Sequence, residues 1–588
     1  MQHRLSILIL TVILAFPLNS FAYGKRLPVV KQHGMVVCAE PQAADIGAEV
    51  LKRGGNAVDA AVATAFALAV TYPSAGNLGG GGFLILHTAN GQNIAIDGRE
   101  TAPALMDSTY YLPQPDGTAR NSLLGYTAAG TPGTVAMLVE THQAFGTLPL
   151  AELLQPAIAL ADSGFIVSHP FAASLRYYAP QFARFPGSAA IFLKETPPDS
   201  LLLPSPVDGQ PLFITEDRYF YHAGDRFYQK DLAQTLRKIA EYGRDGFYTG
   251  EIPQRIEQAM IAHGGAMRAA DFANYQVKFR EPVYGSYRGY EVVSMPPPSS
   301  GGIALVQLLN ILEGYPLAWL GHNSAETIHL MTEAERRVYA DRFEYLGDPD
   351  YVDVPMEGLT SKLYADKLRQ KINRYYKTPS RAVKAGNPPG YESPETTHLC
   401  VVDSAGNAVS LTYTLNTSYG SKVVVPGTGF LLNNELDDFT TQPGQPNYYG
   451  LMQGNRNIVA PGKRPLSSMT PTILLKNGTV AMVVGSPGGS TIITTVLQII
   501  LNVIDHGMNA HEALHAPRVH HQWYPDKIYY EKYGLAHDVI QNLSAKGHRV
   551  DEHYWGYIGR AELILIDPET GELQGMSDPR GQGAVRGY

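Results

Sequence analysis

The feature that most constrains this chain is the stretch AVSLTYTLN (Ala408–Asn416), in which apolar and polar side chains alternate from the second residue on. A period of two predicts a β-strand with one face in a core. The turn 403–407 before it predicts pairing with a preceding strand, 397–402. The apolar face carries Val409, Leu411, Tyr413 and Leu415, and the other face presents Ser410, Thr412, Thr414 and Asn416.

A loop without apolar periodicity, Gly386 to Glu395, runs directly into Thr396 and the first of these strands. The expected pairing brings the polar row beside Thr396. A threonine hydroxyl is a poor nucleophile unless a base lies next to it. If the Glu395–Thr396 bond were cut, Thr396 would carry its own base, a free α-amine with a pKa of about 8. The loop therefore predicts a chain that cuts itself to create its catalyst.

Composition and charge narrow the class of protein. The chain has 588 residues, a hydrophobic content of 44% and a net charge of −8. The hydrophobic content is typical of a globular protein with an ample core. The negative net charge argues against nucleic acid as a partner, because binding nucleic acid needs a basic face.

Three stretches have helical patterns: 44–53, 56–70 and 325–342. Gly54-Gly55 separates the first two, and in the third Glu333 and Arg337 are spaced for an ion pair. Together with the strands they indicate a mixed α and β chain.

The first 22 residues predict a signal peptide. A basic residue at Arg4, an apolar run from Leu5 to Phe16 and small residues at Ser20 and Ala22 fit the pattern. We expect a mature chain from Tyr23, in the periplasm or secreted, with no membrane contact after cleavage. An uncleaved anchor is the alternative.

Only two cysteines are present, Cys38 and Cys400, and each lies in an apolar run that resembles a strand. An exported protein can form disulfides. Two buried free thiols and one bridge are both compatible with the sequence.

Four consecutive glycines, Gly79–Gly82, precede an apolar strand. They predict either close approach to another backbone or positive φ angles. A packing turn and the wall of a site are equally compatible with the pattern.

The stretch HEALH (His511–His515) matches a zinc motif, with Glu531 available as a third ligand. However, Pro517 ends any helix here and Asn509 caps its start, so both imidazoles would lie on barely two turns. We interpret the match as coincidental, and we predict no metal and no cofactor.

Eight further motifs span nearly the whole mature chain: GNLGGGGF, DGRETAP, TTH, TYTLNT, LLNNELDDF, KRPLSSMTPT, GSPGGS and APRVHHQW. Together they resemble the γ-glutamyltranspeptidases (glutathione hydrolases), members of the N-terminal nucleophile hydrolases. The resemblance implies an α/β (α+β) fold, a four-layer αββα sandwich. It also implies a precursor that cuts itself between Glu395 and Thr396. The products, a large subunit (23–395) and a small catalytic subunit (396–588), would remain together as a heterodimer.

The resemblance also implies catalytic roles. Thr396 would be the nucleophile, Thr414 would hydrogen-bond it, and the N–H groups of Gly488 and Gly489 would form an oxyanion hole. The local sequence agrees, because AMVVGSPGGSTIITTVLQIIL predicts a buried strand, a glycine turn and an apolar helix capped by Ser490.

A γ-glutamyl group ends in an α-carboxylate and an α-ammonium, so its pocket needs both signs of charge. A planar guanidinium suits a carboxylate, which it binds through two hydrogen bonds. The residues that the resemblance implies are Arg99, Ser467 and Ser468 for the carboxylate, Asn416, Glu435 and Asp438 for the ammonium group, and Tyr449 for the gating position of a lid loop, TTQPGQPNYYGLMQG.

The function implied is γ-glutamyl transfer from glutathione or similar donors to water, an amino acid or a peptide. One alternative is an acylase of the same superfamily that acts on glutaryl side chains or polyglutamate. Such an enzyme need not bind an α-ammonium group, so Asn416, Glu435 and Asp438 favour γ-glutamyl donors. Another is a secreted binding or structural protein, which would be expected to lack Thr396 or Arg99. The sequence leaves open the preferred acceptor.

Overall fold

The computed structural model describes residues 27–113, 120–195, 217–386, 388, 398–441, 445–452 and 454–588, and the backbone of 202–204 and 211–213. The expected cleavage site, Glu395–Thr396, and the expected signal peptide, 1–22, lie outside these residues.

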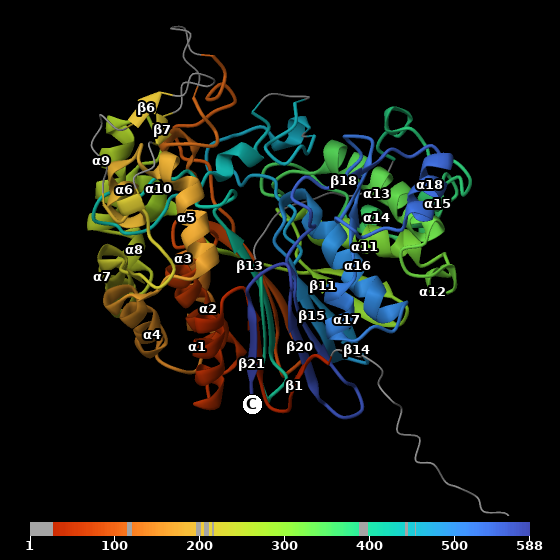
Figure 1. Cartoon of the computed structure of the whole chain (residues 1–588), viewed down its shortest axis with the longest axis horizontal. Coiled ribbons are helices and arrows are strands. Elements are labelled where there is room, and N and C mark those ends of the chain that lie inside the picture. Colours follow the sequence, from red (N-terminus) through yellow and green to blue (C-terminus); the bar gives the residue numbers. More distant parts are fainter. Residues whose placement is uncertain are drawn as a thin grey trace, which may run out of the picture.

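Two seven-stranded sheets pack face to face at the centre of the molecule (Figure 1). Their pairings are antiparallel. Apolar side chains from both sheets, such as Phe83, Ile85, Ile473 and Val483, fill the space between them. The first sheet has the order β21 (Ala584–Gly587), β2 (Met35–Cys38), β12 (Leu399–Val402), β13 (Ala408–Thr414), β3 (Gly81–His87), β4 (Asn93–Gly98) and β9 (Lys278–Arg280). The second has the order β1 (Val29–Lys31), β20 (Leu573–Ser577), β19 (Glu562–Ile566), β15 (Thr479–Gly485), β14 (Thr472–Lys476), β11 (Tyr290–Ser294) and β10 (Val283–Tyr287).

Helices cover the outer face of each sheet and complete four layers (Figure 1). This confirms the expected αββα sandwich. On the side of the first sheet are α1 (Pro41–Lys52), α2 (Ala57–Thr71), α3 (Thr134–Phe145), α4 (Leu150–Ser163), α5 (His169–Phe182), α6 (Pro186–Phe192), α7 (Lys230–Tyr242), α8 (Asp245–Tyr248), α9 (Glu251–Ala262) and α10 (Ala269–Asn274); α1, α2 and α3 pack directly on its strands. On the side of the second are α11 (Ser300–Leu312), α12 (Leu317–Leu320), α13 (Ala325–Tyr345), α14 (Met356–Leu359), α15 (Lys362–Arg369), α16 (Ile492–Ile504), α17 (Ala510–His515) and α18 (His537–Ala545); α11, α16 and α17 pack directly on its strands.

Smaller sheets join β5 (Phe165–Ile166) to β8 (Arg226–Phe227), β6 (Leu202–Pro204) to β7 (Pro211–Phe213), and β16 (Val519–His520) to β17 (Ile528–Tyr530) and β18 (Val550–Glu552).

The three expected helices are α1, α2 and α13. Asn56 caps α2 and exchanges hydrogen bonds with Asp59 in a capping box, which fixes the start of the helix. On α13, Glu333 and Arg337 form the expected ion pair at 2.8 Å, but both side chains are buried. The helix is buried over most of its length because it packs against other helices, above all α11 and α18. Thr378 also donates hydrogen bonds to the Glu333 carboxylate.

The pairing of β12 with β13 confirms the two strands expected from the alternation, with Leu399 opposite Leu411. The apolar face of β13 packs in the helix-side core, as predicted. The polar face is also buried, because it lies against the second sheet: the Ser410 hydroxyl donates to the Val484 carbonyl (3.3 Å) and accepts from the Thr472 N–H (2.9 Å).

The two cysteines are free and buried. Cys400 lies opposite Val37 in the β2–β12 ladder. Its side chain packs between the sheets, whereas that of Cys38 packs among the helices on the other face. Successive side chains of a strand point to opposite faces, so this register keeps the thiols apart.

In the part of the chain that the structure describes, no helix is both long and apolar enough to cross a membrane.

Candidate functional site

In the expected small subunit (396–588), the described residues begin at His398, two residues after the expected nucleophile. His398 Nδ1 lies 3.0 Å from Thr412 Oγ1 on β13. At the end of β13, Thr414 Oγ1 accepts a hydrogen bond from the Asn416 N–H at 2.8 Å. The expected nucleophile, Thr396, and its neighbour Glu395 lie outside the described residues, so their roles remain predictions.

The glycine run lies directly against Thr414. The Asn77 side chain donates to the Thr414 carbonyl (2.9 Å) and accepts from the Gly80 N–H (2.9 Å). A Cβ on Gly80 would collide with that carbonyl. None of the four glycines has a positive φ angle. Close approach to Thr414, and of Gly81 to Glu100, therefore accounts for this run. Asn77 was not singled out from the sequence.

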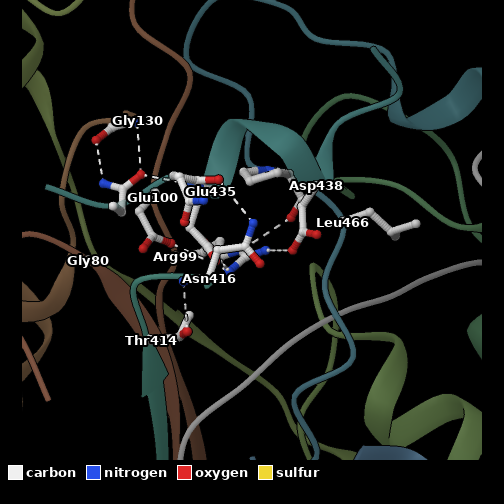
Figure 2. A network of polar contacts seen from close by, with 12 residues as sticks. Gly80, Arg99, Glu100, Gly130, Thr414, Asn416, Glu435, Asp438 and Leu466 are labelled. Carbon is white, nitrogen blue, oxygen red and sulfur yellow. Dashed lines mark hydrogen bonds and ion pairs between the residues drawn. The ribbon is translucent and has the colours of Figure 1, made fainter. Parts of the chain in front are cut away.

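Arg99 lies at the centre of a buried charged cluster (Figure 2). It follows β4, and the short helix η5 (Glu435–Asp438) brings two carboxylates to it. Arg99 Nη1 lies 2.5 Å from Glu435 Oε2, and Nη2 lies 2.8 Å from Asp438 Oδ2. The side chains of all three are at most 1% exposed. A cation and two anions thus form one desolvated cluster.

The resemblance assigned Arg99 to the donor's carboxylate and the two acids to its ammonium group, which left their contact with each other unforeseen. The structure brings the guanidinium into direct contact with both carboxylates. The hydroxyls of Ser467 and Ser468, expected beside Arg99, are buried and have no hydrogen-bond partner among the described residues. They follow Pro465, whose carbonyl accepts from Arg99 Nε at 3.3 Å.

A third carboxylate, Glu100, lies 3.5 Å from Arg99 Nη1. Burial raises the pKa of Glu100, and the Arg99 charge opposes the rise. The motif DGRETAP contains Glu100, but only its neighbour Arg99 was selected from it. Close packing beside Gly81, where a Cβ would meet the Glu100 carboxylate, fixes its position.

Asn416 extends this cluster toward β13 (Figure 2). Its backbone has a φ of 76°, a left-handed conformation that asparagine tolerates better than most residues. Its side-chain NH₂ donates to the Asn434 carbonyl at 3.0 Å. Its side-chain oxygen is buried and has no partner within the described residues. A buried oxygen of this kind is suited to accept a hydrogen bond from a ligand ammonium group.

The glycine turn Gly488-Gly489 lies between β15 and α16. Both glycines have positive φ angles, 141° and 57°. Within the described chain, neither N–H donates to a protein acceptor, so both amides are available to a ligand. The expectation that Ser490 caps the following helix is wrong: Ser490 lies in the 3₁₀ turn η7 (Gly489–Thr491), and α16 follows Thr491 without a side-chain cap.

Tyr449 covers this turn. Its hydroxyl donates to the Asn416 carbonyl at 2.7 Å, and a Cβ on Gly489 would collide with its ring. Nearby, Asn447 Nδ2 donates to Asp438 Oδ1 at 2.9 Å. The loop expected to be a lid is thus hydrogen-bonded to Asn416 and to Asp438 of the charged cluster, and Asn447 is a contact that sequence reasoning missed.

The HEALH stretch forms the short helix α17. The Glu512 carboxylate accepts from the Asn509 N–H at 3.0 Å and completes a capping box. Glu531 is held by Arg580, with Nη2 2.5 Å from Oε2. Both acids therefore have structural roles. Among the residues that the structure describes, no group of three His, Cys, Asp or Glu side chains could hold a metal ion.

Comparisons with known proteins identify the family of this chain. A glutathione hydrolase proenzyme of Escherichia coli (strain K12) is 47% identical over 555 residues, which are 94% of this chain and 91% of that protein. The crystal structure of a cephalosporin acylase from Bacillus halodurans matches with a TM-score of 0.82 at 28% identity, over 98% of this chain and 99% of that one. A gamma-glutamyltranspeptidase structure from Helicobacter pylori matches with a TM-score of 0.53 at 42% identity, over 59% of this chain and 95% of that one. The family model described as Gamma-glutamyltranspeptidase matches residues 43–588, and the chain therefore belongs to the gamma-glutamyltranspeptidase family.

Proposed function

We propose that this protein is a self-processing γ-glutamyltranspeptidase and glutathione hydrolase. The observation that carries the proposal is the buried cluster of one guanidinium and two carboxylates around Arg99. A γ-glutamyl group offers the complementary pair, an α-carboxylate and an α-ammonium group. A buried cluster of both signs is costly for stability alone, which favours a binding role.

The cluster is bordered by hydrogen-bonding groups that lack protein partners among the described residues. The hydroxyls of Ser467 and Ser468 can donate to a carboxylate, and the Asn416 side-chain oxygen can accept from an ammonium group. We propose that the donor's α-carboxylate binds Arg99 and the two serines. Its α-ammonium group would bind Asn416, Glu435 and Asp438, and would replace part of the contact between the acids and Arg99.

Catalysis would start from the free amine of Thr396. The amine takes the proton of the Thr396 hydroxyl while Oγ attacks the γ-carbonyl carbon. The N–H groups of Gly488 and Gly489 stabilise the oxyanion that forms, and Thr414 hydrogen-bonds the nucleophile. The proton then passes to the leaving nitrogen as the C–N bond breaks, which leaves a γ-glutamyl ester on Thr396. Water or an amine opens this ester and restores the hydroxyl.

The same hydroxyl would first cut the precursor. Attack of Thr396 Oγ on the Glu395 carbonyl carbon gives an ester, and water opens it into subunits 23–395 and 396–588. We further propose export through the signal peptide 1–22 to the periplasm or the medium, with Tyr449 on a lid that closes over the bound donor.

A comparison of two substrates tests this function. A γ-glutamyl anilide and its glutaryl analogue differ only in the α-ammonium group. The purified protein should cleave the γ-glutamyl compound with a kcat/KM at least about tenfold higher, because the analogue leaves buried carboxylates without their partner. Equal cleavage of both compounds would replace the proposal by a glutaryl acylase. If the protein cleaves neither compound, the proposed enzymatic function is wrong.

A further inference from the structure

Arg560 lies beside the glycine turn of the proposed oxyanion hole. Its backbone N–H donates to Ser486 Oγ at 3.1 Å, two residues before Gly488. A Cβ on Gly488 would lie 3.4 Å from the Cα of Gly559, so the two backbones are in contact. The loop that carries Arg560 therefore forms one side of the place where the ester would react.

The guanidinium of Arg560 faces phenols rather than acids. Its Nη2 donates to the Tyr557 hydroxyl, and its Cζ lies 4.8 Å from the centre of the Tyr557 ring. Burial lowers the pKa of Arg560, but the neighbouring phenols of Tyr72 and Tyr557 raise it overall. Among the described residues, no Asp or Glu carboxylate lies within 4.0 Å of the Arg560 guanidinium. Its Nε is buried and has no hydrogen-bond acceptor in the same part of the chain.

Two tyrosines near Tyr557 have a raised pKa, so they carry no charge at neutral pH. Burial raises the pKa of Tyr554 to about 12, and the phenols of Tyr448, on the lid loop, and Tyr557 contribute to the rise. Burial likewise raises the pKa of Tyr178, with Tyr557 again among the contributing neighbours. The phenols that influence or are influenced by Tyr557 thus come from α5 (Tyr178) and from the loop after β18 (Tyr554), and Tyr448 is a further neighbour of Tyr554. They give the guanidinium an aromatic setting, and the approach of Gly559 to Gly488 brings the loop that carries it to the edge of the proposed reaction site.

A half-buried guanidinium without a carboxylate is an unusual arrangement, because desolvation favours pairing. It is suited to recruit a carboxylate from a ligand through two parallel hydrogen bonds. The donor's own α-carboxylate is already assigned to Arg99 and the two serines. The remaining carboxylates in the reaction belong to the amine that attacks or leaves.

We propose that Arg560 binds the carboxylate of the acceptor, a free amino acid or a short peptide, and so selects acceptors that carry this group. The inference rests on the proposed function, since it concerns the second step of the same reaction. The aromatic groups around Tyr557 would pack against the acceptor's side chain. Tyr557 itself holds the guanidinium in place, and it is a positioning residue.

The test measures how the γ-glutamyl ester divides between water and acceptor. Wild type, Arg560→Gln and the charge-retaining Arg560→Lys react with one γ-glutamyl anilide in the presence of L-alanine, L-alanyl-L-alanine or L-alaninamide. Transfer product and free glutamate are quantified in the same reaction, so their ratio does not depend on the amount of active enzyme. The value compared is the acceptor concentration at which both products are equal.

We expect this concentration to rise roughly 10- to 100-fold for a carboxylate acceptor in Arg560→Gln, the effect of losing a charge-assisted hydrogen bond. It should rise less in Arg560→Lys. L-alaninamide lacks the carboxylate and so never makes the contact that the variants lose. For this acceptor, the concentration at which both products are equal should stay within about twofold of the wild-type value in each variant. The arm that changes most, amino acid or dipeptide, identifies the natural length of the acceptor.

The inference is contradicted if the acceptor concentration for equal products rises as much for L-alaninamide as for the carboxylate acceptors. It is also contradicted if that concentration rises for neither carboxylate acceptor. In both cases, glutamate release by wild type still supports the proposed function. Failure of wild type to release glutamate would instead remove the proposed function. If neither variant is cut into two chains, Arg560 serves folding, and the inference is wrong.

Discussion

Arg99 and Asp438 form a buried ion pair, with Nη2 2.8 Å from Oδ2. The other carboxylate oxygen of Asp438 accepts from Asn447 on the lid loop at 2.9 Å. One carboxylate thus joins the proposed donor pocket to the lid. A ligand ammonium group that binds Asp438 would act on both contacts, which gives a physical route from donor binding to lid position.

The ion pair predicts a large loss of stability when the cation is removed. Arg99→Met leaves Glu435 and Asp438 buried without their counter-ion, and such losses typically cost about 3–5 kcal/mol. Urea unfolding at one protein concentration measures the free energy of unfolding. As a control, Glu435→Gln and Asp438→Asn added to Arg99→Met should recover much of the loss. If Arg99→Met is as stable as wild type, the cluster is not desolvated as described.

Asp438→Asn predicts a loss of substrate discrimination. The substitution keeps the shape of the side chain and its contact with Asn447 but removes the charge that would pair with the donor's ammonium group. We expect the preference for a γ-glutamyl anilide over its glutaryl analogue to fall by about tenfold or more. Ratios of kcat/KM for the two substrates give the result. A variant that keeps the full preference would assign ammonium recognition elsewhere.

Tyr449→Phe removes one hydrogen bond and keeps the ring that packs on Gly489. The bond to the Asn416 carbonyl should contribute about 0.5–1.5 kcal/mol, so kcat/KM for a γ-glutamyl anilide should fall about two- to tenfold. Tyr448→Phe is the matched control, since the Tyr448 hydroxyl has no hydrogen bond within the described residues. If both substitutions lower kcat/KM equally, the Tyr449 hydroxyl has no specific role.

Lys422 predicts a pH dependence of stability. Its ammonium group is buried near the site, where Nζ donates to the Gly420 carbonyl at 2.6 Å. Burial lowers the pKa of Lys422 to about 7 from an ordinary value of 10.5. Between these values the unfolded chain binds more protons than the folded one, so this residue makes stability rise with pH. The gain is lost as pH falls from about 10.5 to about 7, and below pH 7 the contribution of Lys422 no longer changes.

The measurement compares wild type with Lys422→Met in urea at several pH values. Relative to the variant, wild type should gain up to about 1.4 kcal/mol in unfolding free energy per pH unit above pH 7. Parallel curves for the two proteins would show that Lys422 keeps an ordinary pKa.

Much of the fold was predictable because its signals are local. The alternation of apolar and polar residues around Thr412 predicts the strand, the faces of its side chains and its pairing with the preceding strand. Asn56 and Asp59 together fix where a helix starts. The charged cluster was recognised only as a set of residues. Its pairing depends on contacts between positions 336 and 339 residues apart, which no local pattern encodes. Arg560 carried no signal at all, because its significance lies in the carboxylates that are missing from its surroundings.

The central claim, that Thr396 becomes an N-terminal nucleophile, is tested most directly by the intact masses of the purified chains. Wild type should give two chains, the smaller beginning at Thr396, together with γ-glutamyl anilide cleavage. Thr396→Ala should give one uncut, inactive chain that is otherwise folded. A wild-type protein that remains a single chain and yet cleaves the anilide would contradict the account.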